Sequence, residues 1–357
     1  MPSMHRYQLP VEQTGWRFNG QSEIDFAWEY DAPRERLLNL YDKAKKSQWD
    51  QATRIDWSTE LDPENPMQLD DRMISINGTE MWQKLTPKEK ARVRHHAQAW
   101  NVSQLMHGEQ GALIATAKIV QMAPDMDAKF YAATQVMDEA RHVESYSRLL
   151  HEKFELAYPM TAPLKTLLEQ GLSDSRWDFV YLCMQVLIEG LALAAFQRLR
   201  DYSKNPLAVA VNAYVMQDEA RHVAFGRIAL RDYYKHLTAH ELGEREEFLV
   251  EGCYLMRERF DAREMWEHLD FPVDKCVEAA MISESQRVFR AQLFSRIVPT
   301  VRDIGLWGPK VKKAYEDMGV MQFADTDIAA KLAADEDWAK ELDAAKARAA
   351  DDSHPRN

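Results

Sequence analysis

The sequence predicts an all-α protein built around a helical bundle, with almost no β-strand. Residues that break helices are scarce, since 13 Gly and 14 Pro make up about 8 % of the 357 residues, against roughly 12 % in average proteins. No segment alternates apolar and polar residues over the length of a strand, whereas helix-start signals recur along the chain. Long helices are therefore the favoured architecture.

Capping signals define the helices of the central part. A capping box is expected to open a long helix at Thr86. Thr86 is the N-cap, Pro87 is the first-turn proline, and Glu89 is the glutamate at the third helical position. Pro124 interrupts the pattern, and Asn205-Pro206 repeats the cap-and-proline signal. The four helices expected for a bundle over 86–240 cover about 86–122, 125–156, 175–203 and 206–237.

The remaining ranges are expected to surround this bundle. Residues 1–85 form an N-terminal extension with one helix that opens at Pro33. Residues 241–325 supply additional packing helices of the same domain, one from the Thr238 cap to about Leu269 and one from about 271 to 304. Residues 326–357 are rich in alanine and acid, and we expect a surface helix or a frayed tail there, not part of the core.

Composition excludes several classes of function. The net charge is −12 and no Lys/Arg-rich stripe appears, so we expect no nucleic-acid partner. The chain has three cysteines, and no two of them are spaced as a CxxC motif. This excludes a disulfide framework and a zinc site made of thiolates. No run approaches 18 apolar residues and the first residues carry no apolar segment, so we expect neither a membrane span nor a signal peptide, and a cytoplasmic location.

One internal repeat carries chemistry. Residues 137–143 read MDEARHV and residues 217–223 read QDEARHV, which places Glu139 with His142 and Glu219 with His222 in two Glu-x-x-His motifs, 80 residues apart. A further glutamate precedes each motif by 30 residues. These two glutamates are Glu109 and Glu189.

Helix geometry brings these six residues together. Residues at i and i+3 share a helix face, so the Glu and His of each motif point the same way. In an antiparallel helix pair, residues equidistant from the turn lie side by side. The midpoint of 109 and 139 is Pro124, and the midpoint of 189 and 219 is next to Asn205, so both midpoints fall on predicted turns. Two packed hairpins would gather four carboxylates and two imidazoles in one core.

Such a cluster needs positive charge. Four buried carboxylates repel one another unless protons or cations neutralise them. Two divalent cations do so, and oxygen with imidazole ligands suits iron or manganese. A lone Glu-x-x-His motif is common on helix surfaces, but Glu189 lies in VLIEGLALAAF, with no other charge between Tyr181 and Gln197. The sequence therefore predicts a dinuclear metal centre.

These residues resemble the ferritin-like di-iron carboxylate superfamily over about 86–240. The resemblance implies a ferritin-like four-helix bundle core with additional helices, and two Fe ions, with manganese or a mixed Mn/Fe pair as alternatives. Its branches include the ribonucleotide reductase small subunit, ligand-binding oxidases, multicomponent monooxygenases, acyl-carrier-protein desaturases and p-aminobenzoate N-oxygenase. The chain departs from three of them. Val215 stands where the N-oxygenase has a third histidine, Leu193 where the monooxygenases have a threonine, and Gly111 and Met184 where the oxidases join a valine to a tyrosine.

The resemblance also assigns supporting residues. In relatives, the Asp before each ligand Glu accepts the free ring N–H of the opposite repeat's histidine, so Asp138 would support His222 and Asp218 would support His142. Arg141 and Arg221 are expected to pair with these two aspartates. The reductase small subunit carries a radical tyrosine four residues beyond the first histidine. Tyr146 stands at that position.

We therefore expect an O2-activating non-haem di-iron oxygenase that oxidises a small organic substrate by hydroxylation or N-oxygenation, with electrons from a separate reductase. The alternatives are an acyl-chain desaturase, a radical-storing subunit built around Tyr146, and a non-catalytic iron-handling protein.

Apolar residues near the ligands are expected to form the substrate pocket: Ala112, Leu113, Val186, Gly190, Val215 and Phe225. His107 is two residues from Glu109, hence on another helix face, and is not expected at the site. The apolar stretches LVEGCYLM and AQLFSRIV predict a homodimer.

Overall fold

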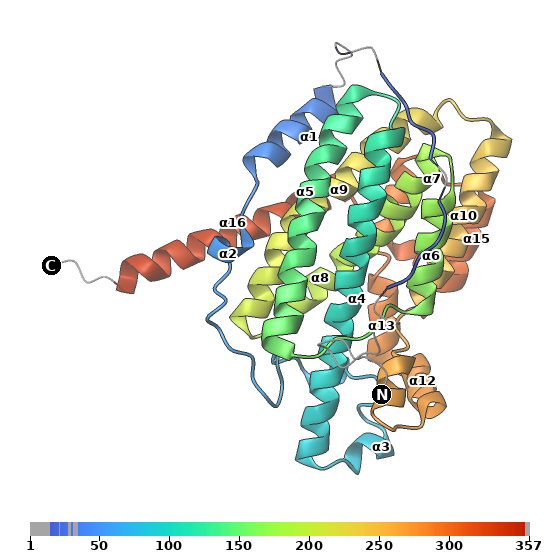
Figure 1. Cartoon of the computed structure of the whole chain (residues 1–357). Helices are drawn as coiled ribbons and strands as arrows, with labels where there is room; N and C mark the ends of the chain where they lie inside the picture. Colours follow the sequence, from blue (N-terminus) through green and yellow to red (C-terminus); the bar gives the residue numbers. More distant parts are fainter. Residues whose placement is uncertain (1–14, 21, 28–29, 31–34, 354–357) are drawn as a thin grey trace.

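The computed structural model describes residues 15–20, 22–27, 30 and 35–353, and this part of the chain contains helices and loops without a β-strand. Figure 1 shows the long helices of the bundle lying side by side. The all-α fold predicted from the sequence is confirmed. The bundle helices are α4 (Pro87–Met122), α5 (Met126–Arg148), α8 (Glu189–Tyr202) and α9 (Pro206–Tyr234).

Side-chain caps fix where the bundle helices begin. The Thr86 hydroxyl accepts a hydrogen bond from the backbone N–H of Glu89, whose side chain bonds back to Thr86, so the capping box at the start of α4 is present. At the start of α5 the Asp125 side chain accepts a hydrogen bond from the backbone N–H of Ala128, and at the start of α9 the Asn205 side chain accepts from that of Leu207. The first helix, α1, covers Glu35–Lys46. Its predicted opening at Pro33 lies outside the described residues.

The third bundle helix contains a π-helical segment that the sequence did not indicate. Helix α7 (Trp177–Tyr181) continues into η4 (Leu182–Ile188), which is π-helical, and then into α8. By length and composition Trp177–Tyr202 is able to span a membrane, but 94 % of its most apolar window is buried inside the bundle. The segment Trp177–Tyr202 is therefore the central, buried helix of the bundle. A second π-helical segment, η3 (Leu149–Phe154), extends α5.

The packing helices after the bundle are shorter than predicted. The segment expected to be one helix to Leu269 is split into α10 (Ala239–Glu258) and α11 (Arg263–His268), because Ala262 between them adopts a left-handed φ of 52°. The segment 271–304 is split into α12 (Val273–Ile282), α13 (Glu284–Gln292) and α14 (Ile297–Asp303). Ser283 causes the first break, since its backbone is extended and its side chain caps α13.

The remaining elements complete the outer layer. They are α2 (Gln51–Arg54), η2 (Asp71–Met73), α3 (Glu80–Gln83), α6 (Ala162–Ser173), α15 (Pro309–Met318) and η5 (Met321–Phe323).

The C-terminal segment differs from the frayed tail or surface helix expected for 326–357. It forms helix α16 (Ile328–Ser353), which packs against α9. Its C-terminal end extends away from the bundle (Figure 1). Asp335 on α16 is buried and pairs with the buried Arg296 through Nη2–Oδ contacts of 2.6 and 2.8 Å. Glu336 is also buried and contacts Arg221. Since these acids neutralise arginines inside the fold, the first half of α16 is part of the core.

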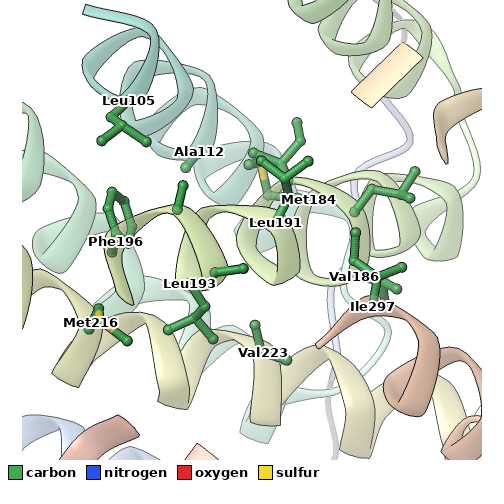
Figure 2. Packing of buried hydrophobic residues seen from close by; sticks show 14 of the residues in the cluster. Leu105, Ala112, Met184, Val186, Leu191, Leu193, Phe196, Met216, Val223 and Ile297 are labelled. Carbon is green, nitrogen blue, oxygen red and sulfur yellow. The ribbon is translucent and has the colours of Figure 1, made fainter. Parts of the chain in front are cut away.

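The bundle core is packed with apolar side chains from three helices. Figure 2 shows α8 between α4, which contributes Leu105 and Ala112, and α9, which contributes Met216 and Val223. The two stretches that predicted a homodimer contribute to the same core: Leu249, Cys253, Met256, Leu293, Phe294, Ile297 and Val298 are all buried within the chain. These faces are therefore unavailable for self-association, and the homodimer stays a prediction.

Candidate metal centre

The six repeat residues meet in the middle of the bundle. They come from all four bundle helices, and each is at most 4 % exposed. They form two overlapping groups whose ligand atoms lie within 4.8 Å of one another. The first group is Glu109, Glu139, His142 and Glu219, and the second is Glu139, Glu189, Glu219 and His222. Glu139 and Glu219 belong to both groups, which is the arrangement of two bridging carboxylates between two metal positions.

Both imidazoles turn the same nitrogen toward the carboxylates. Nδ1 of His142 lies 3.2 Å from Glu109 and 3.0 Å from Glu219. Nδ1 of His222 lies 3.1 Å from Glu139 and 3.5 Å from Glu189. The two rings therefore face the cluster from opposite repeats.

The other ring nitrogen of each histidine contacts an aspartate of the opposite repeat. Nε2 of His142 lies 3.1 Å from Asp218, and Nε2 of His222 lies 3.3 Å from Asp138. An ionised carboxylate only accepts hydrogen bonds, so it holds the ring proton on Nε2 and leaves the Nδ1 lone pair facing the cluster. The structure thus brings together the cross-repeat pairs that the resemblance implied.

The donor set fits two metal ions. Glu139 Oε2 and Glu219 Oε1 are buried and have no hydrogen-bond partner. Burial, together with the charge of Glu219, raises the pKa of Glu109 well above its ordinary value. The oxygens of four carboxylates and the Nδ1 lone pairs of two imidazoles converge at this point, and two divalent cations would bind and neutralise them. Oxygen and imidazole ligands suit iron or manganese.

Two arginines neutralise the supporting aspartates. Arg141 Nη2 donates to Asp218 Oδ2 at 2.8 Å and also to Asp138. Arg221 Nη2 donates to Asp218 Oδ1. All four side chains are buried. Each aspartate therefore has a buried cationic partner in addition to its histidine.

Two further supporting residues come from the loop after α1, and sequence reasoning missed them. Gln48 Nε2 donates to Asp138 Oδ1 at 2.7 Å, and Trp49 Nε1 donates to Asp218 Oδ2 at 2.7 Å. The Trp49 ring also lies 4.8 Å from the Arg141 guanidinium carbon. Nothing in the local sequence distinguishes these loop residues, because their contacts are made with helices far along the chain.

A buried glutamine on the ligand face was also missed. Gln135 Nε2 donates to Glu139 Oε1 at 2.9 Å and to Glu189 Oε1 at 3.1 Å, and Gln185 Nε2 donates to Gln135 Oε1 at 3.1 Å. Gln135 lies one helical turn before Glu139, so its spacing was a usable signal. Its counterpart in the second repeat is Val215, which is buried and offers only hydrocarbon.

Tyr146 is buried beside the cluster, and its hydroxyl is hydrogen-bonded to a side chain that is not one of the six ligands. The hydroxyl donates to Asn212 Oδ1 at 3.1 Å, and the ring stacks on Phe196 with centroids 5.8 Å apart. Burial and the charges of Glu109 and Glu219 raise the pKa of Tyr146 well above its ordinary value. Its proton is therefore held firmly on the oxygen.

A small pocket, which we call the inner pocket, opens on one side of the cluster. Glu109, Glu189 and Glu219 form part of its wall. The remaining lining residues are Gln104, Leu105, Gly108, Ala112, Ile188, Leu191, Ala192, Phe196 and Arg259. A larger outer pocket shares Leu105 with it.

Of the six residues expected to line the substrate pocket, only Ala112 does so. Gly190 packs against Ile297, where an added Cβ would lie 3.0 Å from a side-chain carbon, and Phe225 packs against the Tyr131 ring at 4.4 Å. Leu113, Val186 and Val215 do not line the inner pocket either. Val186 lies in the π-helical η4, which ends directly before Glu189, and Gly190 directly follows Glu189 in α8.

This fold and this donor set define a ferritin-like protein with a dinuclear metal centre. Residues 31–305 match the sequence model of the family described as P-aminobenzoate N-oxygenase AurF. The chain belongs to this family, and it is accordingly a non-haem di-iron oxygenase.

Solved structures with a similar architecture include two point mutants of an R2-like ligand-binding oxidase. One has an anaerobically reconstituted Mn/Fe cofactor; it is 17 % identical, covers 79 % of this chain and 94 % of its own, and gives a TM-score of 0.41. The other has an aerobically reconstituted Fe/Fe cofactor; it is 17 % identical, covers 84 % of this chain and 95 % of its own, and gives a TM-score of 0.41. No curated protein matches this chain.

Proposed function

We propose that the protein is an N-oxygenase that transfers one oxygen atom from O2 to the nitrogen of a small aromatic amine. The observation that supports this most directly is the match of residues 31–305 to the family described as P-aminobenzoate N-oxygenase. The inner pocket supports a reaction beside the metal ligands, because its wall contains three carboxylates of the cluster and is otherwise largely apolar.

The proposed reaction balances with an external source of two electrons. The amine R–NH2, O2, two electrons and two protons give R–NHOH and water. The nitrogen gains one oxygen atom, and the second oxygen leaves as water. We assign the electrons to a separate donor or reductase. Iron bound by the six residues supplies the capacity to activate O2.

The chain's own residues would orient and protect the reacting groups. Gln135 donates hydrogen bonds to carboxylate oxygens of both Glu139 and Glu189, and would so fix the relative positions of two residues that would hold the metal ions. Leu105 and Phe196 give the inner pocket apolar walls, which would limit the access of water to the reacting groups. The hydrogen bond from Tyr146 to Asn212 keeps this tyrosine out of the transfer.

The test is turnover of 4-aminobenzoate by the iron-loaded protein with a chemical reductant under ¹⁸O2. We expect an ¹⁸O-labelled hydroxylamine, or its further oxidation products, by mass spectrometry. The Glu189→Ala variant is the negative control. Labelling of a ring carbon would instead indicate a hydroxylase. Desaturation of an acyl chain offered in parallel, without amine oxidation, would contradict the proposal.

A further inference from the structure

A row of aromatic side chains leads away from the metal centre, and the proposed reaction does not use it. Its inner end is formed by Tyr131, two helical turns before Glu139 on α5, and by Phe225, one turn after His222 on α9. Both side chains are fully buried, and their ring centroids are 4.4 Å apart. The row therefore begins on the ligand faces of two bundle helices.

The row continues without a gap to the surface. The Tyr181 ring lies 5.1 Å from Phe225 and 5.2 Å from Trp177, and the Trp177 ring lies 4.7 Å from Tyr233. Tyr181 is fully buried, whereas Trp177 and Tyr233 are partly exposed. We call this set the aromatic row, and its members from the core outward are Tyr131, Phe225, Tyr181, Trp177 and Tyr233.

Two hydrogen-bonded glutamines separate the aromatic row from the ligands. Gln135 and Gln185 each lie four residues before a ligand glutamate, and they bond to each other at 3.1 Å. Tyr131 and Tyr181 lie four residues before these glutamines, and both contact the Phe225 ring. The inner rings thus occupy the second layer of side chains from the metal centre.

Packing alone does not explain the tyrosine at the inner end. The Tyr131 hydroxyl is buried and has no hydrogen-bond partner among the described residues. A buried hydroxyl without a partner is destabilising, and phenylalanine would place the same ring there without this cost. A phenol differs from a phenyl ring in losing an electron far more readily. The residue type at this position therefore indicates a role in electron transfer.

We propose that the aromatic row supplies electrons to the metal centre when O2 reacts there in the absence of substrate, and so protects the ligands from oxidation. The inference goes beyond the proposed function, since it requires O2 activation but not N-oxygenation. Phe225 is not oxidised in this scheme. The electron crosses its ring between Tyr131 and Tyr181, both of which contact it.

The electron count closes without an amine. Reduction of O2 to two water molecules takes four electrons and four protons. In the proposed N-oxygenation the donor gives two electrons and the amine nitrogen gives the other two. Without an amine, Trp177 and Tyr233 each lose one electron and release the N–H or O–H proton to water. A thiol in solution then returns one hydrogen atom to each ring and is itself oxidised to a disulfide.

The test follows radicals on the protein and not turnover. Reduced, iron-loaded protein is mixed with O2 without an amine and frozen at intervals for electron paramagnetic resonance. We expect a radical whose signal narrows when the tyrosines or tryptophans carry ring deuterium. Peptide mass spectrometry after repeated O2 exposure without a thiol should find added oxygen at Trp177 and Tyr233.

Tyr181→Phe interrupts the aromatic row but keeps a ring at this position. It should bind as much iron as wild type and lose most of the radical signal and most of the added oxygen at Trp177 and Tyr233. Tyr315→Phe is the matched control, because Tyr315 is fully buried in the outer layer, where its ring pairs with Trp307. The control should give the wild-type radical yield.

Three results would overturn the proposal. They are the absence of a tyrosine or tryptophan radical in wild type, an unchanged radical yield in Tyr181→Phe, and a radical that disappears in Tyr146→Phe. If Tyr181→Phe fails to fold, Trp177→Phe decides, since it should abolish the tryptophan signal and most oxidation of Tyr233. Adding 4-aminobenzoate should suppress the radical. A radical that persists unchanged with this amine would contradict the N-oxygenase proposal and still support the aromatic row.

Discussion

Replacing Asp218 with asparagine should weaken both the fold and the metal centre, because this carboxylate joins the two. Its oxygens accept hydrogen bonds from Arg141 at 2.8 Å and from Trp49 at 2.7 Å, and one lies 3.1 Å from Nε2 of His142. Arg221 donates to it as well. The side chain is fully buried, so water cannot replace these contacts.

The expected loss of unfolding free energy depends on which ion pairs Arg141 and Arg221 keep when Asp218 is replaced. Removing one member of a buried ion pair costs about 3–5 kcal/mol. Arg141 retains Asp138 and Arg221 retains a 3.4 Å contact with Glu336, so we expect the lower end, about 3 kcal/mol, in the free energy of unfolding of Asp218→Asn. Loss of the carboxylate behind His142 should reduce metal affinity by roughly 10- to 100-fold.

Urea unfolding of the metal-free protein measures the first quantity, and competition with a chelator measures the second. Asp317→Asn serves as control, since Asp317 pairs with Lys313 on the surface and is 52 % exposed. Its unfolding free energy should change by less than about 1 kcal/mol. The reasoning is refuted if Asp218→Asn unfolds and binds metal as the control does.

Three further predictions address the tail helix, the tyrosine and the pocket. Asp335→Ala should lower the free energy of unfolding by about 3–5 kcal/mol, because Arg296 is left buried and unpaired; a loss below about 1 kcal/mol would show that α16 is dispensable. Tyr146→Phe should cost about 1–2 kcal/mol through the unsatisfied Asn212 oxygen but keep substantial turnover; loss of activity together with a tyrosyl radical signal would contradict this. At Gly108 an added Cβ meets open space, so Gly108→Ala should stabilise α4 by up to about 1 kcal/mol in thermal unfolding and raise KM by narrowing the pocket; an unchanged KM would place the substrate elsewhere.

Much of the bundle was predictable because its signals are local. The capping box at Thr86 and the cap at Asn205 start their helices as the sequence indicated. The six repeat residues were predictable for a different reason. Their common 80-residue offset and the predicted turns at the midpoints indicate which helices pair, without any tertiary information. The structure brings these six residues together.

The features that were missed depend on contacts between distant segments. Trp49 contacts Asp218, which is 169 residues further along the chain. Asp335 contacts Arg296 because α16 packs on the bundle, and an alanine-rich acidic sequence does not indicate that packing. The π-helical η4 changes the helical phase of the residues before Glu189, and the spacing of a regular α-helix does not indicate this change. Arg259 joins the pocket only because α10 ends beside α4.

The central claim is that six residues hold two metal ions, and anomalous X-ray scattering at the iron edge tests it most directly in crystals of the iron-loaded protein. We predict two peaks per chain. One should lie between Nδ1 of His142 and Glu109, the other between Nδ1 of His222 and Glu189, with Glu139 and Glu219 close to both. A single peak, no peak, or peaks on the Nε2 side of the histidines would contradict the account.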